Sequence, residues 1–126
     1  MTDTISALFW TGLGGVIGGP LRFLLSGLVG RRFGETFPWG TVAVNVSGAV
    51  AIGILWTVQH FLPPFGWTLL ATGVLGSYTT VSSFSLQTLA LAQDGQVRTA
   101  ALHAAGSTAA CLTGAALGAW IGRLFL

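Results

Sequence analysis

The sequence predicts an all-α membrane protein of four transmembrane helices, with the third helix broken in the middle of the membrane. Of the 126 residues, 52% are hydrophobic and only 6% are charged, whereas a soluble domain carries roughly 25% charged residues. The apolar residues form four stretches, each reaching the ~20 residues that cross hydrocarbon as a helix. The stretches cover 5–29, 39–62, 65–92 and 97–126, and we expect a single integral membrane domain over 1–126.

The connections between these stretches are short and hold most of the charged residues. In a protein with four spans, the first and third connections lie on one face of the membrane, and both termini lie on the other. Arg31, Arg32 and Arg98 belong to the first face, and only Arg123 belongs to the second. Because arginine is enriched in cytoplasmic loops, this bias favours a cytoplasmic position for the first and third connections.

Composition and missing residue types exclude several classes of function. The net charge of +2 is spread over distant arginines and makes no nucleic-acid-binding surface. The one cysteine, Cys111, cannot form an internal disulfide. Asp3, Glu35 and Asp94 lie at a terminus or in a connection, so no span holds the carboxylate that a proton-coupled carrier usually needs. The sequence offers no nucleophile–base pair and no metal cluster, and we therefore expect no enzyme.

Small residues recur every four positions in the first and last stretches. Such stripes let another helix backbone approach closely, either within the chain or in a second subunit. Four helices of this size cannot by themselves enclose a wide pathway, so we expect an oligomer. The stripes comprise Gly106, Ala110, Gly114, Gly118 and Gly122 in the last stretch, and Gly14/Gly18 and Gly15/Gly19 in the first.

The third stretch carries a run of hydroxyl-bearing residues in the middle of an apolar segment. Between Gly76 and Thr88, serine, threonine and glutamine surround the helix instead of forming one stripe. Hydrocarbon tolerates such a run only where protein or a wet cavity meets it. We expect the helix to break near Gly76 and to offer free backbone groups to a cavity or an ion. The alternative is that the hydroxyls bond back to their own helix.

Three further polar residues lie inside the predicted spans. Asn45 could donate to an anion, or it could bridge two helices. Arg22 could attract anions into a vestibule, or it could snorkel to the interface. His103 is of a type that is more often a satisfied polar contact than a ligand, and no second His, Cys or carboxylate lies at metal-ligand spacing beside it.

Four segments together resemble the Fluc family of bacterial fluoride channels, over nearly the whole chain. Residues 14–22 (Gly-Gly-Val-Ile-Gly-Gly-Pro-Leu-Arg) resemble the family's glycine-rich first helix, which ends in arginine. Residues 40–48 (Gly-Thr-Val-Ala-Val-Asn-Val-Ser-Gly) resemble its asparagine motif. Residues 76–85 (Gly-Ser-Tyr-Thr-Thr-Val-Ser-Ser-Phe-Ser) are similar to the break in its third helix, and 103–107 (His-Ala-Ala-Gly-Ser) to part of its fourth.

The resemblance implies an antiparallel, dual-topology dimer in the bacterial inner membrane, surrounded by lipid, with two fluoride pathways at the subunit interface. It also implies a structural sodium ion at the dimer centre, bound by the backbone carbonyls of Gly76 and Thr79. An aromatic ring edge is electropositive, so Phe84 would contact the anion without holding it tightly. The implied pathway is lined by Asn45, Ser82, Ser83, Phe84, Ser85 and Ser107, with Arg22 in a vestibule or structural role.

The chain departs from the family pattern at three positions. Val81 stands where the family has a second phenylalanine, Ser77 where it has a second glycine, and Gln87 where it usually has glutamate. Since each family pathway takes aromatic side chains from both subunits, a homodimer of this chain lacks one ring in each pathway. A homologous partner in a heterodimer would restore that ring, or the chain could be a non-conducting subunit that assembles a partner's pore.

We therefore expect a passive, fluoride-selective channel that exports cytoplasmic fluoride. Fluoride enters cells from acid surroundings as neutral HF and is trapped inside as the anion, so a passive exit suffices. Two alternatives stay open. One is a subunit of a heterodimeric fluoride channel that is inactive or partly active alone, and the other is a small four-helix proton-coupled exporter.

Overall fold

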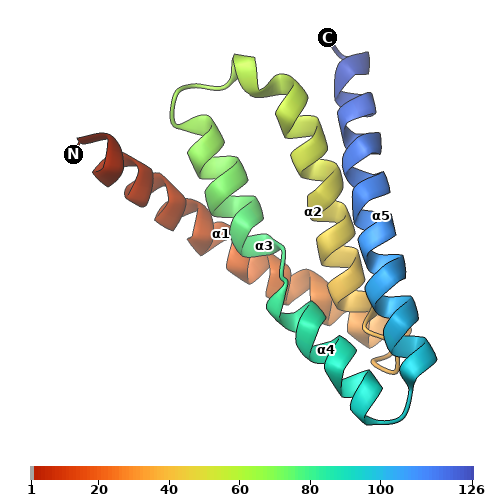
Figure 1. The fold of residues 1–126 in the computed structure, drawn as a ribbon. Helices are drawn as coiled ribbons and strands as arrows, with labels where there is room; N and C mark the ends of the chain where they lie inside the picture. Colours follow the sequence, from red (N-terminus) through yellow and green to blue (C-terminus); the bar gives the residue numbers. More distant parts are fainter. Residues whose placement is uncertain (1) are drawn as a thin grey trace.

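The computed structural model describes residues 2–126, and this part of the chain contains helices and no strand (Figure 1). The all-α expectation is confirmed for these residues. Of the short elements, η1 is a single 3₁₀ turn, and η2 has the wider i→i+5 hydrogen bonding of a π-helix. The elements are α1 (Thr2–Phe33), α2 (Trp39–Val58), η1 (Gln59–Phe61), η2 (Thr68–Leu75), α3 (Gly76–Tyr78), α4 (Ser82–Gln93) and α5 (Val97–Leu124).

Three of the described helices are long and apolar enough to cross a membrane, namely Asp3–Phe33, Trp39–Phe61 and Val97–Leu124. The third predicted stretch, 65–92, forms η2, α3 and α4 instead of one continuous helix. An α-helix rises only about 1.5 Å per residue. None of the three pieces therefore spans the ~30 Å of bilayer hydrocarbon alone.

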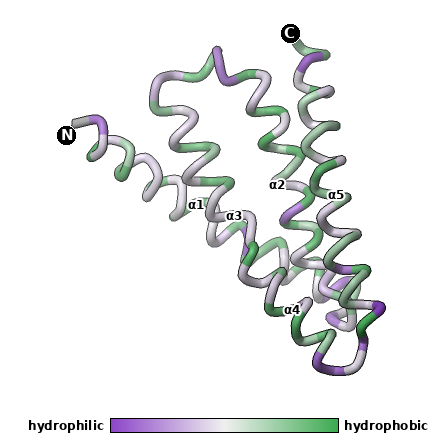
Figure 2. Tube along the Cα trace, viewed as in Figure 1, coloured by the Kyte–Doolittle hydropathy of each residue, from purple (hydrophilic) through white to green (hydrophobic). Residues whose placement is uncertain are grey.

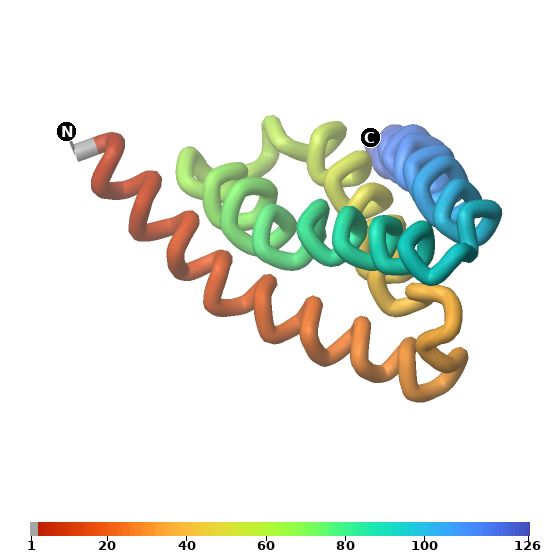
Figure 3. Tube along the Cα trace, turned by 60° about the horizontal axis from the view of Figure 1, so that its bottom comes forward, coloured from red at the N-terminus to blue at the C-terminus, as the bar shows by residue number. Residues whose placement is uncertain are grey.

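We define η2, α3 and α4 as the third segment. The helices form two packed pairs, α1 with the third segment and α2 with α5, and α1 also contacts α2. α2 and α5 lie side by side over most of their length, while η2 and α3 lie against α1 (Figures 1 and 3). The third segment runs in the same direction as α1, and α2 and α5 run in the opposite direction (Figure 1). Because α4 contacts α5, the third segment connects the α1 side of the molecule to the α2–α5 side.

Glycines allow α1 and η2 to touch backbone to backbone. A Cβ atom on Gly14 would lie 2.6 Å from the Cα of Gly73, and one on Gly18 would collide with the Val74 carbonyl. A Cβ atom on Gly19 would meet nothing within 4 Å. Of the first stripe, the Gly14/Gly18 side therefore packs within the chain, which is one of the two alternatives that the sequence left open.

The glycine stripe of α5 makes the same kind of contact with α2. A Cβ atom on Gly118 would collide with the Val50 carbonyl, and one on Gly122 would collide with the Thr57 side chain. Gly106, at the other end of the stripe, is exposed. The later part of this stripe therefore packs within the chain. The exposed beginning, at Gly106, is free to contact a second subunit.

Two glycines with positive φ end the helices on the side of the arginine-rich connections. Gly34 (φ +83°) follows α1, and its N–H donates to the Gly30 carbonyl at 2.9 Å. Gly95 (φ +80°) follows α4, and the next N–H, of Gln96, donates to the Leu91 carbonyl at 2.9 Å. These are the left-handed C-terminal caps in which glycine avoids the steric cost of a Cβ atom.

Burial in this chain is inverted relative to a soluble protein. Hydrophilic residues lie mainly at the ends of the chain and in the connections, while the helices are largely apolar (Figure 2). Large apolar side chains such as Phe23 and Trp56 are 83% and 60% exposed, which water would penalise and lipid would not. Among the described residues, the buried hydrophobic side chains are only Val44, Leu91 and Ala100. The buried polar side chains are Thr41, His103 and Ser107.

We predict that Gly118→Ala destabilises the protein by about 1–3 kcal/mol, the usual cost of forcing extra atoms into a packed interface. Its Cβ atom would meet the Val50 carbonyl, which cannot move without shifting α2. The matched control is Gly12→Ala on α1, where nothing lies within 4 Å, so the better helix propensity of alanine leaves stability unchanged or slightly higher. Thermal unfolding in detergent measures both. Equal unfolding temperatures for the two variants would contradict the close α2–α5 contact.

Candidate functional site

The third segment loses its helical conformation between Tyr78 and Ser82. Thr79 is extended, with φ −81° and ψ 160°, whereas Gly76 is still helical, with φ −61° and ψ −31°. The sequence led us to expect a break near Gly76, and the first extended residue is Thr79, three positions later. Gly76 has an ordinary helical backbone, and the residue with extended backbone is a threonine.

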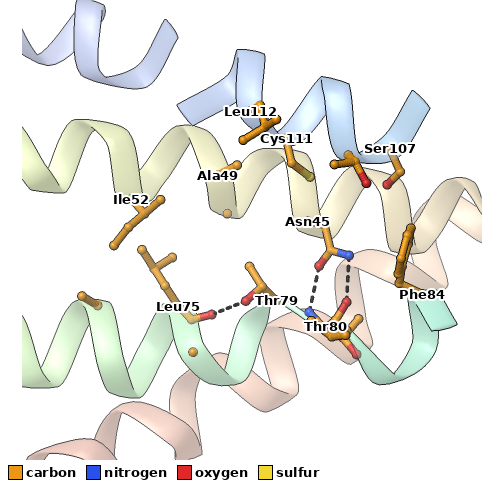
Figure 4. Close-up of a pocket in the computed structure, with 15 residues that line it drawn as sticks. Asn45, Ala49, Ile52, Leu75, Thr79, Thr80, Phe84, Ser107, Cys111 and Leu112 are labelled. Atoms are coloured by element: carbon orange, nitrogen blue, oxygen red, sulfur yellow. Dashed lines mark hydrogen bonds between the residues drawn. The ribbon is translucent and has the colours of Figure 1, made fainter. Parts of the chain in front are cut away.

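Asn45 of α2 holds the break through both halves of its side-chain amide. The Thr80 N–H donates to Asn45 Oδ1 at 2.8 Å, and Asn45 Nδ2 donates to the Thr80 carbonyl at 2.9 Å (Figure 4). The amide therefore pairs with a main-chain residue much as a neighbouring β-strand would. The bridging role that the sequence left open for Asn45 is present in the structure. One Nδ2–H remains free of this pair.

Three more side chains satisfy groups at the break. Arg22 of α1 donates from Nη1 to the Thr79 carbonyl at 3.3 Å. The Thr79 hydroxyl donates to the Leu75 carbonyl at 3.0 Å (Figure 4), and the Thr80 hydroxyl accepts the Ser83 N–H at 3.1 Å. This last bond caps the first turn of α4. Polar groups that a continuous helix would have paired internally are thus paired by α1, by α2 and by the break itself.

A groove of about 480 Å³ lies beside the break, with α2, the third segment and α5 as its walls. Most of its lining is apolar, including Ala49, Ile52 and Leu112 (Figure 4). The groove brings together six of the residues that the sequence singled out. They are Asn45, Gly76, Thr79, Val81, Phe84 and Ser107.

A second, more polar space lies on the α1 side of the break. It is a pocket of about 210 Å³ that holds Arg22 and Ser83, with Ser26 and Thr41 beside them. Thr80 lines both this pocket and the groove. Arg22 and Ser83 therefore lie together, but on the opposite side of Thr80 from the groove.

The 210 Å³ pocket adjoins a larger one of about 900 Å³ near the arginine-rich connections. Ser83 lines both of them. Arg31, Glu35 and Asp94 also line the larger pocket, so its lining includes charged side chains of both signs. Of the remaining predicted site residues, Ser82 and Ser85 are exposed and line none of these pockets. The structure therefore does not bring the three serines of α4 together.

The sequence missed a cluster around His103 on α5. Its ring is fully buried, and Nδ1 lies 2.9 Å from the Thr88 hydroxyl on α4. Its ring centroid lies 5.2 Å from that of Phe84 and 5.5 Å from that of Phe37. The available signal was that Thr88 follows Phe84 by four residues, which places both on one helix face. No local pattern connects Phe37, in the connection after α1, to this cluster.

Two backbone carbonyls at the groove are suited to a hard cation. The Thr80 N–H, which would bond to the Gly76 carbonyl in a continuous helix, bonds to Asn45 instead. The Thr79 carbonyl keeps one lone pair beside its bond to Arg22. Carbonyl oxygens are ligands for such ions, but two from one chain do not complete a shell. Within residues 2–126, no group of three or more His, Cys, Asp or Glu side chains could hold a metal ion.

These features define a class of protein: a small, multi-pass, helical membrane protein whose broken helix borders a groove between helices. The chain belongs to the CrcB-like family, because the family model described as "CrcB-like protein, Camphor Resistance (CrcB)" matches residues 9–119.

Individual relatives match along most of the chain. A protein of Rhodopseudomonas palustris named "Fluoride-specific ion channel FluC 2" is 51% identical over 94% of this chain and 94% of that protein. A protein of the same name from Bradyrhizobium diazoefficiens is 48% identical over 84% of this chain and 81% of that protein. "Fluoride-specific ion channel FluC" of Paramagnetospirillum magneticum is 44% identical over 89% and 88% of the two. The resemblance stated from the sequence is confirmed, and the family is one of channels and not of enzymes.

We predict that Asn45→Ala lowers the stability of the folded protein by about 1–3 kcal/mol, because it removes two hydrogen bonds and leaves the Thr80 amide and carbonyl unpaired. Thr108→Ala is the matched control, since its hydroxyl bonds only to the Ala104 carbonyl of its own helix. Thermal unfolding in detergent compares the two. A loss for Asn45→Ala no larger than for the control would show that the amide does not hold the break.

Proposed function

We propose that the chain is a subunit of a passive, fluoride-selective channel that exports fluoride across the bacterial inner membrane. The observation that carries the proposal is the break in the third segment, where Asn45, Phe84 and Ser107 lie in one groove. The relatives that match nearly all of the chain bear the name of fluoride-specific channels.

The third segment serves as the fourth membrane crossing in this proposal. It leads from the α2 end near Pro63 to the connection before α5, and it runs opposite to α2 and α5 (Figure 1). A broken helix is tolerated at membrane depth where protein covers it or where it lines a cavity. The Asn45 and Arg22 bonds and the adjoining groove meet both conditions.

The groove offers an anion several weak contacts and no strong one. Phe84 offers an electropositive ring edge, Ser107 a hydroxyl, and Asn45 its remaining amide hydrogen. Neither an acidic nor a basic side chain lines the groove within the described residues. Conduction needs sites that are favourable enough to enter and weak enough to leave. On the other side of Thr80, the Arg22 guanidinium supplies the positive charge that draws anions toward the break.

A second subunit completes the site in our proposal, in the antiparallel arrangement of a dual-topology dimer. The groove is open on the side that faces away from this chain, and Val81, which lines it, is 77% exposed. A structural sodium ion at the dimer centre would be held by the Gly76 and Thr79 carbonyls of both subunits. When bound, it would supply positive charge that fixes the broken segments together. The support for this ion from one chain is that Gly76 and Thr79 both line the groove and that the Gly76 carbonyl has lost the Thr80 N–H to Asn45.

A heterodimer is the second candidate, favoured by Val81. In a homodimer, every pathway combines Phe84 of one subunit with Val81 of the other, so each has a single ring. A homologue with an aromatic residue at the position of Val81 restores the second ring. The numbered names of relatives such as "Fluoride-specific ion channel FluC 3" of Brucella suis are in keeping with organisms that hold more than one such chain. A proton-coupled exporter is disfavoured because the lining of the groove contains no carboxylate.

We predict that liposomes containing only this chain release fluoride passively and retain chloride. Val81→Phe should raise the fluoride flux severalfold by adding a ring edge, and Phe84→Ile should lower it by about tenfold or more, since one lost contact of about 1.4 kcal/mol is a factor of ten. A fluoride-selective electrode measures release after an ionophore relieves the charge imbalance. Leu112→Phe, which adds a ring to the same groove away from the break, is the control for added bulk.

Three outcomes separate the candidates. Flux from the single chain supports the homodimer. Silence that is relieved by a co-reconstituted homologue supports the heterodimer. Fluoride release that requires an imposed proton gradient would instead indicate an exporter and overturn the channel proposal.

A further inference from the structure

His103 has two ring nitrogens in different situations, although the whole ring is buried. Nδ1 lies 2.9 Å from the Thr88 hydroxyl oxygen. Nε2 has no hydrogen-bond partner among the described residues. The side chain is 0% exposed, so Nε2 cannot be paired by bulk water. A buried polar atom without a partner is unusual enough to require a reason.

Counting protons assigns the roles of these two nitrogens. The Thr88 hydroxyl lies 2.7 Å from the Phe84 carbonyl, and a carbonyl oxygen can only accept. We assign the single hydroxyl proton to the Phe84 carbonyl, the shorter of the two contacts, so that the Thr88 oxygen accepts from His103 Nδ1–H. In the neutral ring, the proton is then on Nδ1, and Nε2 carries a lone pair. A lone pair repels an anion, so this nitrogen is not a fluoride ligand.

The same cluster constrains the Phe84 ring. The His103 ring is tilted by 41° against the Phe84 ring, with 5.2 Å between their centroids. The Phe37 ring makes a T-shaped contact with the same His103 ring, at 5.5 Å and 86°. Thr88 is bonded both to the Phe84 main chain and to His103. A rotation of the imidazole would break the Thr88 bond and change the surface against which Phe84 packs.

We propose that Thr88 and His103 form a positioning pair, in which the Thr88 hydroxyl fixes the imidazole through Nδ1–H and the fixed imidazole sets the orientation of the Phe84 ring. This inference rests on the proposed function, because Phe84 is the ring that contacts fluoride there. His103 acts through Phe84 and not by binding the anion. The hydrogen bond from Thr88 determines which face of the imidazole packs against the Phe84 ring.

Two amide substitutions separate positioning from anion binding. His103→Asn places an N–H close to the position of Nδ1, and His103→Gln places one close to the position of Nε2. We expect His103→Asn to keep fluoride-over-chloride selectivity within about threefold of the parent, and His103→Gln to lose about tenfold or more. Selectivity is measured from reversal potentials or from paired fluoride and chloride efflux. Retention by Gln with loss by Asn, or equal loss by both in folded protein, overturns the proposal.

Thr88 provides the reciprocal test. Thr88→Ser keeps the hydroxyl and should keep selectivity, whereas the isosteric Thr88→Val should lose it to the same extent as His103→Gln. Thr57→Val is the matched control, since its hydroxyl also bonds back to its own helix, to the Ile54 carbonyl, far from the break. Selectivity that survives Thr88→Val would contradict the role of the hydroxyl.

A readout independent of conduction keeps this inference distinct from the proposed function. If the pair exists, the combined Thr88→Val and His103→Gln variant should lose less unfolding temperature than the sum of the two single losses, because the bond between the two side chains can be lost only once. Additive shifts would refute the pair. If neither this chain nor its mixture with a homologue conducts fluoride, the proposed function fails, while the unfolding data still decide whether the pair exists.

Discussion

A backbone that leaves its helix must find hydrogen-bond partners elsewhere in the protein, and Asn45 meets this demand. In hydrocarbon, an unpaired N–H or C=O group costs several kcal/mol, so an unsupported break would refold into a helix. Asn45 pairs with both main-chain groups of Thr80, and Arg22 takes the Thr79 carbonyl. The groove depends on this support, since Phe84 and Val81 follow the break and their direction is set there.

The break also divides two environments of opposite character. Arg22 and Ser83 lie in a polar pocket on the α1 side, and Phe84 and Ser107 lie in a mainly apolar groove on the other. Thr80 borders both. Strong charge attracts an ion but also retains it. In the proposed channel, the Arg22 guanidinium bonded to the Thr79 carbonyl would attract the anion, and the uncharged groove would let it pass.

The sequence predicted the features that depend on composition. It did not predict the features that depend on contacts between residues far apart in the chain. The apolar stretches follow from composition alone, and the helices α1, α2 and α5 lie on them. The break was expected near Gly76 from local propensity, but it begins at Thr79 because Asn45, 35 positions before Thr80, binds there. The resemblance implies that Ser82, Ser83 and Ser85 line one pathway. In the single chain Ser83 lines a pocket while Ser85 is exposed, because neighbouring helix positions point about 100° apart. The pairing of Thr88 with His103 required knowing how α4 packs on α5.

The position of Val81 bears on how many different chains build the complete site. It directly precedes α4, lines the groove and is 77% exposed, so whatever covers the groove also covers Val81. A two-fold axis between identical subunits repeats every residue, and it would therefore pair each Phe84 with a side chain that has no ring edge. In the proposed dimer with two pathways, a valine at that position would weaken both pathways of a homodimer equally. In the proposed heterodimer it would weaken only the pathway to which it belongs and leave the other with both rings.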